Sequence, residues 1–249
     1  MSTVFLPTRI LARNFAGISR KMAKIIKLDN DILEKQLSMA AKSLQAGNII
    51  AVPTDTIYGL AGLAQSTEAV EQIYAIKGRN SSKPVAISVA EVSDIPRWAR
   101  MTVPMELLQD LLPGPVTVVM QRTAALNTNL NPTTDLVGIR VPQHKFMRQL
   151  AETCMEPIAL TSANTSAAGN TIDIQEFENL WPQLDLVLDG GRLESTQAVR
   201  EGSTVVDLSV EGQFRVLRVG CAYMSTVDVL ANKYDLTDIT EYVIPNGVH

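Results

Sequence analysis

The residues best suited to chemistry in this 249-residue chain are cations and small polar side chains that lie far apart in the sequence. The segment KGRNSSKP, residues 77–84, carries three cations beside a glycine and two serines. Arginine can bind phosphate oxygens with a bidentate fork, and lysine binds them as a point charge. The segment therefore predicts either a loop that neutralises a polyphosphate or a solvated basic loop.

Two further segments place small polar residues where an apolar run ends. In PIALTSANTSAAGN, residues 157–170, an apolar run leads into hydroxyl and amide side chains. Small donors at the end of a strand can approach phosphate or ribose closely. PTDTIYGL, residues 53–60, follows another apolar run and combines proline, short polar side chains and Gly59. Each segment predicts a binding lip or, as an alternative, an ordinary turn.

Arg140 stands inside the apolar pattern GIRVP, residues 138–142, where an unpaired cation would be costly. It needs an anionic partner, which can be a structural carboxylate or the carboxylate of a substrate. LPGPVT, residues 112–117, predicts a rigid turn before a strand. GSTVVDL, residues 202–208, places hydroxyls at a strand start, which is a common structural device.

Several sequence motifs are absent, and their absence narrows the mechanism. Neither GxxxxGK[ST] nor GxGxxG occurs. The histidines are His144 and His249, so a Ser-His-Asp triad or a histidine-based zinc site is disfavoured, and no metal-ligand set is predicted. His144 is interpreted as a capping or surface residue at a helix start. We therefore expect catalysis by positioning and charge stabilisation, as in adenylyl transfer.

These segments are positioned by an alternation of helical and strand patterns. Asp31 and Glu34 have capping-box spacing before an amphipathic run. Helices are expected at residues 33–44, 67–77 and 147–154. Strands are expected at residues 49–52, 84–89, 116–120, 137–141, 158–160, 186–188, 204–208 and 214–218. The pattern predicts an α/β fold with one mixed sheet covered by helices.

Composition and charge indicate a globular, acidic protein with a basic first segment. The chain has 46% hydrophobic residues and no apolar run of about 20 residues that would predict a membrane span. Residues 1–28 hold six Lys or Arg and no acid, which leaves 16 basic and 26 acidic residues in the rest. This segment predicts a mitochondrial transit peptide or a disordered basic tail, with Met22 as a second start for a cytoplasmic form. Cys154 and Cys221 are expected to be reduced thiols.

Taken together in their order along the chain, these segments resemble the YrdC family over about residues 32–221. The resemblance implies a single YrdC-like domain at residues 29–221, a twisted mixed sheet around a basic cavity, followed by a C-terminal tail at 222–249. It also implies a nucleotidyltransferase that makes threonylcarbamoyl-AMP and pyrophosphate from L-threonine, bicarbonate or CO₂, and ATP with Mg²⁺. The product would pass to a transferase complex that modifies adenosine 37 of tRNA.

The same resemblance assigns site residues by position. The catalytic signatures KxR and SxN fall on Lys77, Arg79, Ser162 and Asn164. The implied nucleotide-binding residues are Arg79, Lys83, Leu136, Ser162, Asn170 and Arg218. The implied threonine-binding residues are Thr56, Ser88, Arg140, Leu160 and Ser203, with Arg140 pairing the substrate carboxylate.

Two alternative functions follow from related proteins. One is a YrdC-like module that binds double-stranded RNA or tRNA without adenylate chemistry, although the acidic body disfavours more than a weak tRNA contact. The other is the carbamoyl-adenylate chemistry of hydrogenase maturation proteins. Those proteins attach acylphosphatase and zinc-finger segments, and neither is recognisable in this sequence.

Overall fold

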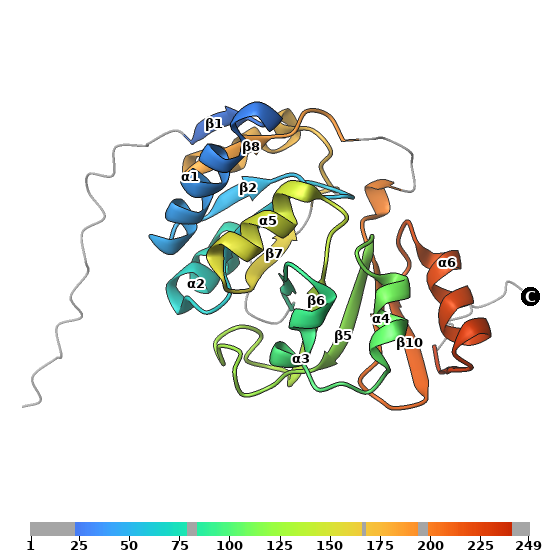
Figure 1. Ribbon diagram of the computed structural model, residues 1–249. Helices are drawn as coiled ribbons and strands as arrows, with labels where there is room; N and C mark the ends of the chain where they lie inside the picture. Colours follow the sequence, from blue (N-terminus) through green and yellow to red (C-terminus); the bar gives the residue numbers. More distant parts are fainter. Residues whose placement is uncertain (1–22, 79–83, 166–167, 194–198, 241–249) are drawn as a thin grey trace, which may run out of the picture.

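The computed structural model describes residues 23–78, 84–165, 168–193 and 199–240. Arg79 and Lys83, which the resemblance assigns to the nucleotide, lie outside the described residues, as does most of the basic first segment. The described part is an α/β fold in which helices cover one large sheet (Figure 1). This confirms the fold class predicted from the sequence.

Eleven strands of the described residues form one sheet in the order β1-β8-β2-β3-β7-β4-β6-β5-β9-β10-β11. Parallel pairs, such as β5 with β9, occur beside antiparallel pairs, such as β5 with β6, so the sheet is mixed. The strands are β1 (Lys24–Lys27), β2 (Ile50–Val52), β3 (Gly59–Leu63), β4 (Ala86–Ser88), β5 (Val116–Gln121), β6 (Leu136–Arg140), β7 (Ile158–Ser162), β8 (Leu186–Asp189), β9 (Thr204–Asp207), β10 (Gln213–Arg218) and β11 (Thr237–Asp238).

The connections between strands contain α-helices and shorter helical turns. The α-helices are α1 (Leu33–Gln45), α2 (Thr67–Ile76), α3 (Ile95–Trp98), α4 (Met105–Leu111), α5 (Lys145–Cys154) and α6 (Tyr223–Asp228). The 3₁₀ turns are η1 (Asn30–Ile32), η2 (Val92–Asp94), η3 (Ile174–Gln183) and η4 (Val199–Glu201), and η5 (Val229–Lys233) is a π-helical turn.

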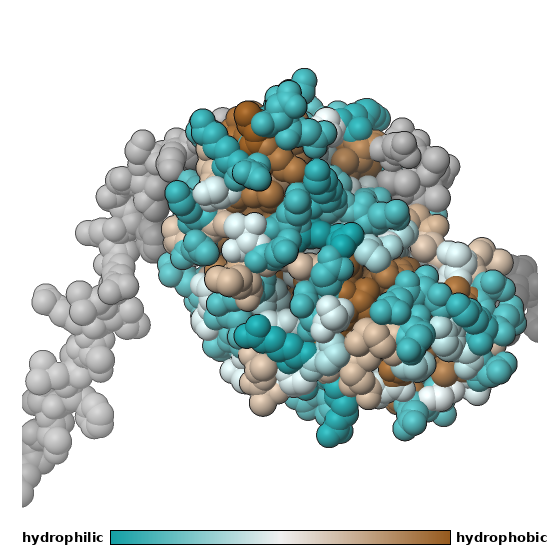
Figure 2. Space-filling view, viewed as in Figure 1, coloured by the Kyte–Doolittle hydropathy of each residue, from teal (hydrophilic) through white to brown (hydrophobic). Residues whose placement is uncertain are grey.

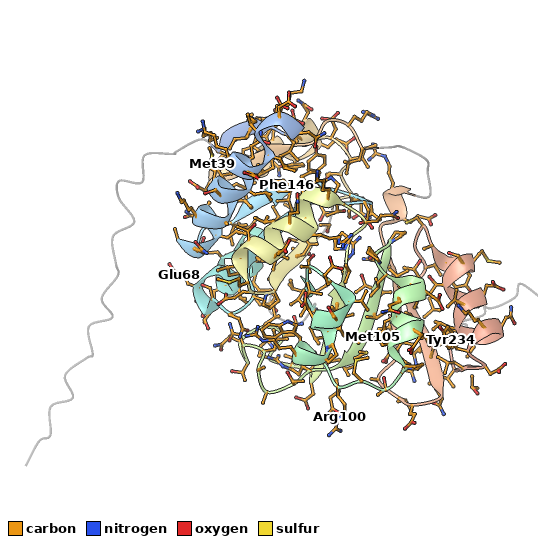
Figure 3. The ribbon with its side chains drawn as sticks, in the orientation of Figure 1. Met39, Glu68, Arg100, Met105, Phe146 and Tyr234 are labelled. Atoms are coloured by element: carbon orange, nitrogen blue, oxygen red, sulfur yellow. The ribbon has the colours of Figure 1, made fainter. Side chains whose placement is uncertain are left out.

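Side chains alternate across the sheet and so divide the buried hydrophobic residues between its two faces. On one face, strand residues such as Ile50 and Leu188 pack with α1 and α5, which lie side by side (Figure 1). Phe146, at the start of α5, belongs to this core and is labelled in Figure 3. On the other face, residues such as Val118 and Ile139 pack in a larger core with α2, α3, α4 and η3. Both cores arise from the apolar stripes of amphipathic helices.

The helices α1 and α5 cover only part of their sheet face. Their core uses residues of β2, β3, β7 and β8, and none from β4, β5, β6, β9 or β10 among its described members. Ala86 of β4 lies opposite Leu160 of β7 in antiparallel register, so their side chains share this face. The side chains of the remaining strands on this face therefore form the floor of a cleft rather than a helix-covered core.

The structure differs from the sequence-based expectations at several local points. The predicted capping box at Asp31 and Glu34 is wrong, because the 3₁₀ turn η1 precedes α1. The cap lies at the start of η1 instead, where Asp29 Oδ1 accepts the N–H of Asp31 at 2.9 Å. β3 is absent from the strands expected from the sequence, and its first two residues, Gly59 and Leu60, end the motif that predicts a binding lip. β1 already lies within the basic segment delimited as residues 1–28.

The residues after 221, delimited as a tail, contribute elements that pack on the domain. β11 pairs in parallel with β10, and η5 lies against α4. Tyr234 donates a hydrogen bond to Asp110 Oδ2 of α4 at 2.5 Å, and Figure 3 shows Tyr234 next to the helix that begins at Met105. Lys233 forms an ion pair with the same carboxylate at 2.6 Å. The domain therefore extends at least through β11.

The surface shown in Figure 2 is mostly hydrophilic, and the apolar side chains form separate areas. Within the part of the chain that the structure describes, no helix has the length and apolar character needed to cross a membrane. Both Cys154 and Cys221 are free thiols, as expected.

Candidate active site

A cleft of about 730 Å³ lies on the part of the sheet face that α1 and α5 leave open. Its floor comes from alternate residues of neighbouring strands, for example Thr117 and Val119 of β5 and Gly138 of β6. The turn after β2 and the end of β7 form its walls. Of the residues assigned by the resemblance, those that line the cleft are Thr56, Leu136, Arg140, Leu160, Ser162, Ser203 and Arg218.

Lys77 joins the end of α2 to the end of β7. Its Nζ donates to Ser162 O at 2.7 Å and to Ser162 Oγ at 3.1 Å. It also lies 2.6 Å from both Asn164 O and Asn164 Oδ1. Only 1% of Lys77 is exposed, and a buried ammonium is tolerated only when oxygens replace its water shell. The four oxygens meet this need, so Lys77, Ser162 and Asn164 form one hydrogen-bonded cluster.

The turn after β7 is fixed by Asn164 as well as by Lys77. Asn164 Oδ1 accepts from Ser162 Oγ at 2.7 Å, and Asn164 Nδ2 donates to Ala168 O and Gly169 O at 2.8 and 2.9 Å. Lys77 and Asn164 are buried and do not line the cleft, whereas Ser162 does. The cluster therefore presents Ser162 to the cleft and keeps the ammonium directly behind it.

Arg140 has a structural carboxylate partner, which is one of the two partners expected from the sequence. Its Nη2 lies 2.6 Å from Asp55 Oδ1, and both side chains are less than one-tenth exposed. The second oxygen of Asp55 accepts the backbone N–H of Gln143 at 2.9 Å. Nη2 is also 3.4 Å from Thr56 Oγ1. The turn after β2 thus supplies both a charge partner and a hydroxyl for the cation of β6.

The turn after β2 is held by its own hydroxyls. Thr54 Oγ1 donates to Ile57 O at 2.7 Å and accepts from Ile57 N at 3.2 Å. Thr54 Oγ1 is also 3.1 Å from Thr56 Oγ1. Tyr58 donates to Gly191 O at 2.6 Å, and this tyrosine has a pKa well above its ordinary value, chiefly because of burial. This internal bonding places Thr56 at the cleft wall and holds Asp55 beside Arg140.

Ser88 is not among the residues that line the cleft, although it lies on the same sheet face as Ala86, two residues before it in β4. It is fully buried and sits beside Arg140 in the parallel register of β4 and β6. Among the described residues, Ser88 Oγ and Arg140 Nε are buried polar atoms without a hydrogen-bond partner. Buried polar groups are usually paired, so this part of the site retains unused donors and acceptors.

A second cation, Arg218 at the end of β10, also lines the cleft. Its Nε and Nη2 donate to Ser203 O at 3.1 and 2.9 Å, and Nη2 lies 3.0 Å from Ser203 Oγ. Ser203 Oγ is 2.8 Å from Thr117 Oγ1 on the floor. Burial lowers the pKa of Arg218, and the positive charge of Arg140 lowers it further. Two guanidinium groups close enough to repel one another create a site that favours anions.

Asn170 lies outside the cleft lining but close to its Arg218 side. Its Nδ2 donates to Arg200 O at 2.7 Å, and Arg200 Nη1 donates back to Asn170 O at 3.1 Å. A Cβ on Gly202 would lie 3.5 Å from Asn170 Nδ2 and 3.6 Å from Arg218 Nη2. Asn170 and Arg218 therefore converge on the same turn, although Asn170 is engaged with Arg200.

The structure thus brings most of the assigned residues together around one cleft. The residue that sequence reasoning missed is Asp55, which lies inside the motif PTDTIYGL. The feature of the sequence that could have pointed to Asp55 is the need of Arg140 for an anionic partner. Among residues 23–78, 84–165, 168–193 and 199–240, no group of three or more His, Cys, Asp or Glu side chains is arranged to hold a metal ion.

The physical character of the cleft indicates what it can bind. Its floor and walls include the apolar side chains Val119, Leu136, Leu160, Val205 and Leu217. Two guanidinium groups and several hydroxyls are distributed among them. Such a site suits a ligand with anionic groups and a flat or apolar part, held by a few fixed donors.

Comparisons with known proteins agree with this architecture. A model of the Sua5/YciO/YrdC family, described as "Telomere recombination", matches residues 42–220. The human threonylcarbamoyl-AMP synthase is 51% identical over 202 residues, which cover 80% of this chain and 72% of the human protein. The corresponding mouse protein is 50% identical with the same coverage.

Solved structures show the same fold. A crystal structure of P. abyssi Sua5 complexed with L-threonine superposes with a TM-score of 0.75 at 26% identity, covering 88% of this chain and 62% of that chain. A variant structure of P. abyssi Sua5 gives a TM-score of 0.71 at 29% identity, covering 80% of this chain and 60% of that chain. This chain therefore spans about 60% of the length of these Sua5 chains.

Proposed function

This chain belongs to the Sua5/YciO/YrdC family, and from that premise we propose that it is a threonylcarbamoyl-AMP synthase. The observation that carries the proposal is the cleft in which Arg140 and Arg218 lie over an apolar floor beside the Lys77, Ser162 and Asn164 cluster. Mammalian proteins that are about 50% identical over 80% of this chain bear that name. Enzymatic adenylate formation fits a site built from fixed charges and hydroxyls rather than from a nucleophile and base.

L-Threonine is assigned to the Arg140 side of the cleft. Its carboxylate would share Arg140 with Asp55, and the Thr56 hydroxyl lies within reach of the same guanidinium group. The P. abyssi Sua5 structure with L-threonine supports threonine as a ligand of this fold. Ser203 and Leu160 line the same cleft and complete this part of the proposal.

ATP is assigned to the side formed by Ser162 and Arg218. Ser162 is held in place by the buried Lys77, and Arg218 is oriented by Ser203. The remaining cations of segment 77–84 are Arg79 and Lys83, two and six residues after Lys77, and they are proposed to neutralise the phosphates. Leu136 offers apolar surface on the floor, and Asn170 lies next to Arg218.

The donor set of the cleft fits a magnesium ion that arrives on the phosphates of ATP. Mg²⁺ commonly keeps several waters and uses one or two protein carboxylates plus substrate phosphates. Asp55 is the carboxylate near the cleft, and it is already engaged by Arg140 and Gln143 N. When bound, the ion would neutralise negative charge on the phosphates. Ser162 and Thr161 supply neutral oxygens in the cleft wall.

The proposed chemistry needs no covalent enzyme intermediate. The amine of threonine adds to CO₂ and loses a proton, which gives an N-carboxylate. One oxygen of that carboxylate attacks the α-phosphorus of ATP, and the bond to the β-phosphate oxygen breaks to release pyrophosphate. Two unit charges 4 Å apart repel by about 4 kcal/mol at an effective dielectric constant of about 20. Arg140 and Arg218 lie where they can offset such repulsion between the anionic reactants.

Beyond the reaction itself, we propose that the product passes to a transferase complex that modifies tRNA. The basic segment 1–28 is proposed to direct part of the protein to mitochondria, while initiation at Met22 gives a cytoplasmic form. Fluorescent fusions of the full chain and of a chain starting at Met22 test this distribution. Identical localisation of the two fusions would contradict the targeting role.

The experiment that tests the catalytic proposal measures pyrophosphate release from ATP by the purified protein. Release is expected only when threonine and bicarbonate are both present. Arg218→Gln should raise the KM for ATP at least tenfold, because its guanidinium group borders the cleft. Arg215→Gln is the matched control, since Arg215 is an exposed residue of the same strand outside the cleft lining. Pyrophosphate release that does not depend on threonine, or equal changes in the KM for ATP in the two variants, would contradict the proposal.

A further inference from the structure

Asn131 is a buried polar residue in the connection between β5 and β6, outside the set of residues assigned to the site. It is 1% exposed and has a φ of 56°, a left-handed conformation that asparagine adopts more readily than most residues. Burial of a side-chain amide is costly unless its donors and acceptor are used. The partners of Asn131 therefore indicate what the residue is for.

The amide of Asn131 pairs with both backbone groups of Val85, the residue just before β4. Oδ1 accepts the N–H of Val85 at 2.7 Å, and Nδ2 donates to Val85 O at 2.9 Å. The side chain thus acts like a short extra strand at the start of β4. Val85 and its neighbours Pro84 and Ala86 line the cleft.

The same residue also binds Tyr74 of α2 twice. The Tyr74 hydroxyl donates to Asn131 Oδ1 at 3.0 Å, and the backbone N–H of Asn131 donates to that hydroxyl at 3.1 Å. Tyr74 lies three residues before Lys77, so it stands on the last turns of the helix that carries the ammonium. Residues three apart on a helix lie on the same side of it.

Asn131 therefore links the two sides of segment 77–84. On one side is α2, which delivers Lys77 to Ser162 and Asn164, and on the other is the cleft edge at Pro84–Ala86. We infer that Asn131 is a positioning residue that fixes this edge of the cleft relative to Lys77. The inference rests on the proposed function for its claim that the edge serves the nucleotide.

The chemistry of the contacts requires an asparagine. Oδ1 accepts two hydrogen bonds while Nδ2 donates one, so an aspartate would lose the donor that Val85 O needs. Leucine, of similar size, would leave the N–H and C=O of Val85 without these partners. Tyr74→Phe removes the hydroxyl but keeps the ring, and so breaks the other half of the link.

The test compares Asn131→Leu and Tyr74→Phe in two measurements. The first is steady-state kinetics, in which the KM for ATP should rise at least tenfold while the KM for threonine changes less than threefold. The second is limited trypsin digestion, in which cleavage after Arg79 should become at least tenfold faster. Combining the two substitutions should give little more than the larger single effect, because both break one link.

Asn127→Leu is the matched control, since Asn127 lies in the same connection and bonds Ala64 O and Thr67 Oγ1 at the start of α2, but makes no hydrogen bond to Val85 at the cleft edge. It should lower the melting temperature without changing the KM for ATP, the KM for threonine or the rate of cleavage after Arg79. Equal rises in both KM values, or cleavage after Arg79 at the wild-type rate in folded Asn131→Leu, would overturn the inference. A wild-type protein without threonine-dependent pyrophosphate release would instead refute the proposed function, and the digestion would still test the positioning role.

Discussion

The buried pair between Arg140 and Asp55 provides the sharpest test of how the cleft is held. Asp55 uses both carboxylate oxygens, one for Arg140 Nη2 at 2.6 Å and one for the N–H of Gln143 at 2.9 Å. Asp55→Asn keeps the shape of the side chain but has a single oxygen. Whichever way the amide turns, its NH₂ faces one of the two donors, and the charge of Arg140 loses its partner.

The magnitude follows from burial. Both side chains are less than one-tenth exposed, so solvent screens the pair weakly. Removing one partner of a buried ion pair costs about 3–5 kcal/mol, and a buried donor without a partner costs about 1–3 kcal/mol. We expect Asp55→Asn to lower the free energy of unfolding by about 3 kcal/mol. For a chain of this size, that corresponds to a fall in Tm of roughly 6–12 °C.

Thermal unfolding without ligands measures this loss, and a threonine titration then tests the substrate assignment. A threonine carboxylate bound at Arg140 would restore the missing anion, so threonine should raise the Tm of Asp55→Asn by at least as much as it raises that of the wild type. Glu91→Gln is the control, because Glu91 pairs with Arg148 at an exposed position and should cost under about 1 kcal/mol. A Tm of Asp55→Asn within 2 °C of the wild type would refute the reasoning.

Two further predictions concern backbone fit and pH. Gly220→Ala should lower the free energy of unfolding by about 3 kcal/mol and weaken nucleotide binding, because the added Cβ would lie 2.4 Å from the backbone of Ser203. Gly169→Ala is the control: nothing lies within 4 Å of its added Cβ, so its free energy of unfolding should stay within about 0.5 kcal/mol of the wild-type value. Equal Tm values for the two variants would contradict this reasoning. Burial lowers the pKa of His144 despite the nearby charge of Asp55, so the folded state resists its protonation. Stability should therefore fall as the pH drops below about 6.5, and His144→Asn should make the Tm less dependent on pH between 7.5 and 5.5.

Much of the fold followed from patterns that are local in the sequence. The run at residues 49–52 and the amphipathic spacing of residues 33–44 correspond to β2 and α1. β3 was missed because GLAGL carries small residues where β-branched ones usually mark a strand. Its glycines are needed there, since a Cβ on Gly59 would lie 2.6 Å from Leu160 Cδ1.

The site was harder to predict because its key contacts cross the sequence. The resemblance placed Lys77, Ser162 and Asn164 in one pocket, and the structure does bring them into contact. The sequence could not show that the ammonium group of Lys77 binds the turn after β7 and is not exposed in the cleft. This depends on how far the C-terminal end of α2 is buried in the folded protein. Arg140 likewise called for an anion, but only the folded chain identifies Asp55 among the 26 acidic residues.

The part of the sheet face that α1 and α5 leave open has a consequence for the stability of the protein in the cell. Leu136 and Val205 are partly exposed on the floor of the cleft, and a ligand lying on them would cover them as α1 and α5 cover the neighbouring strands. A small molecule bound in the cleft would therefore stabilise the folded state for as long as it stays bound. The concentration of those molecules would then affect the rate at which the protein is degraded by proteases, as well as its rate of catalysis.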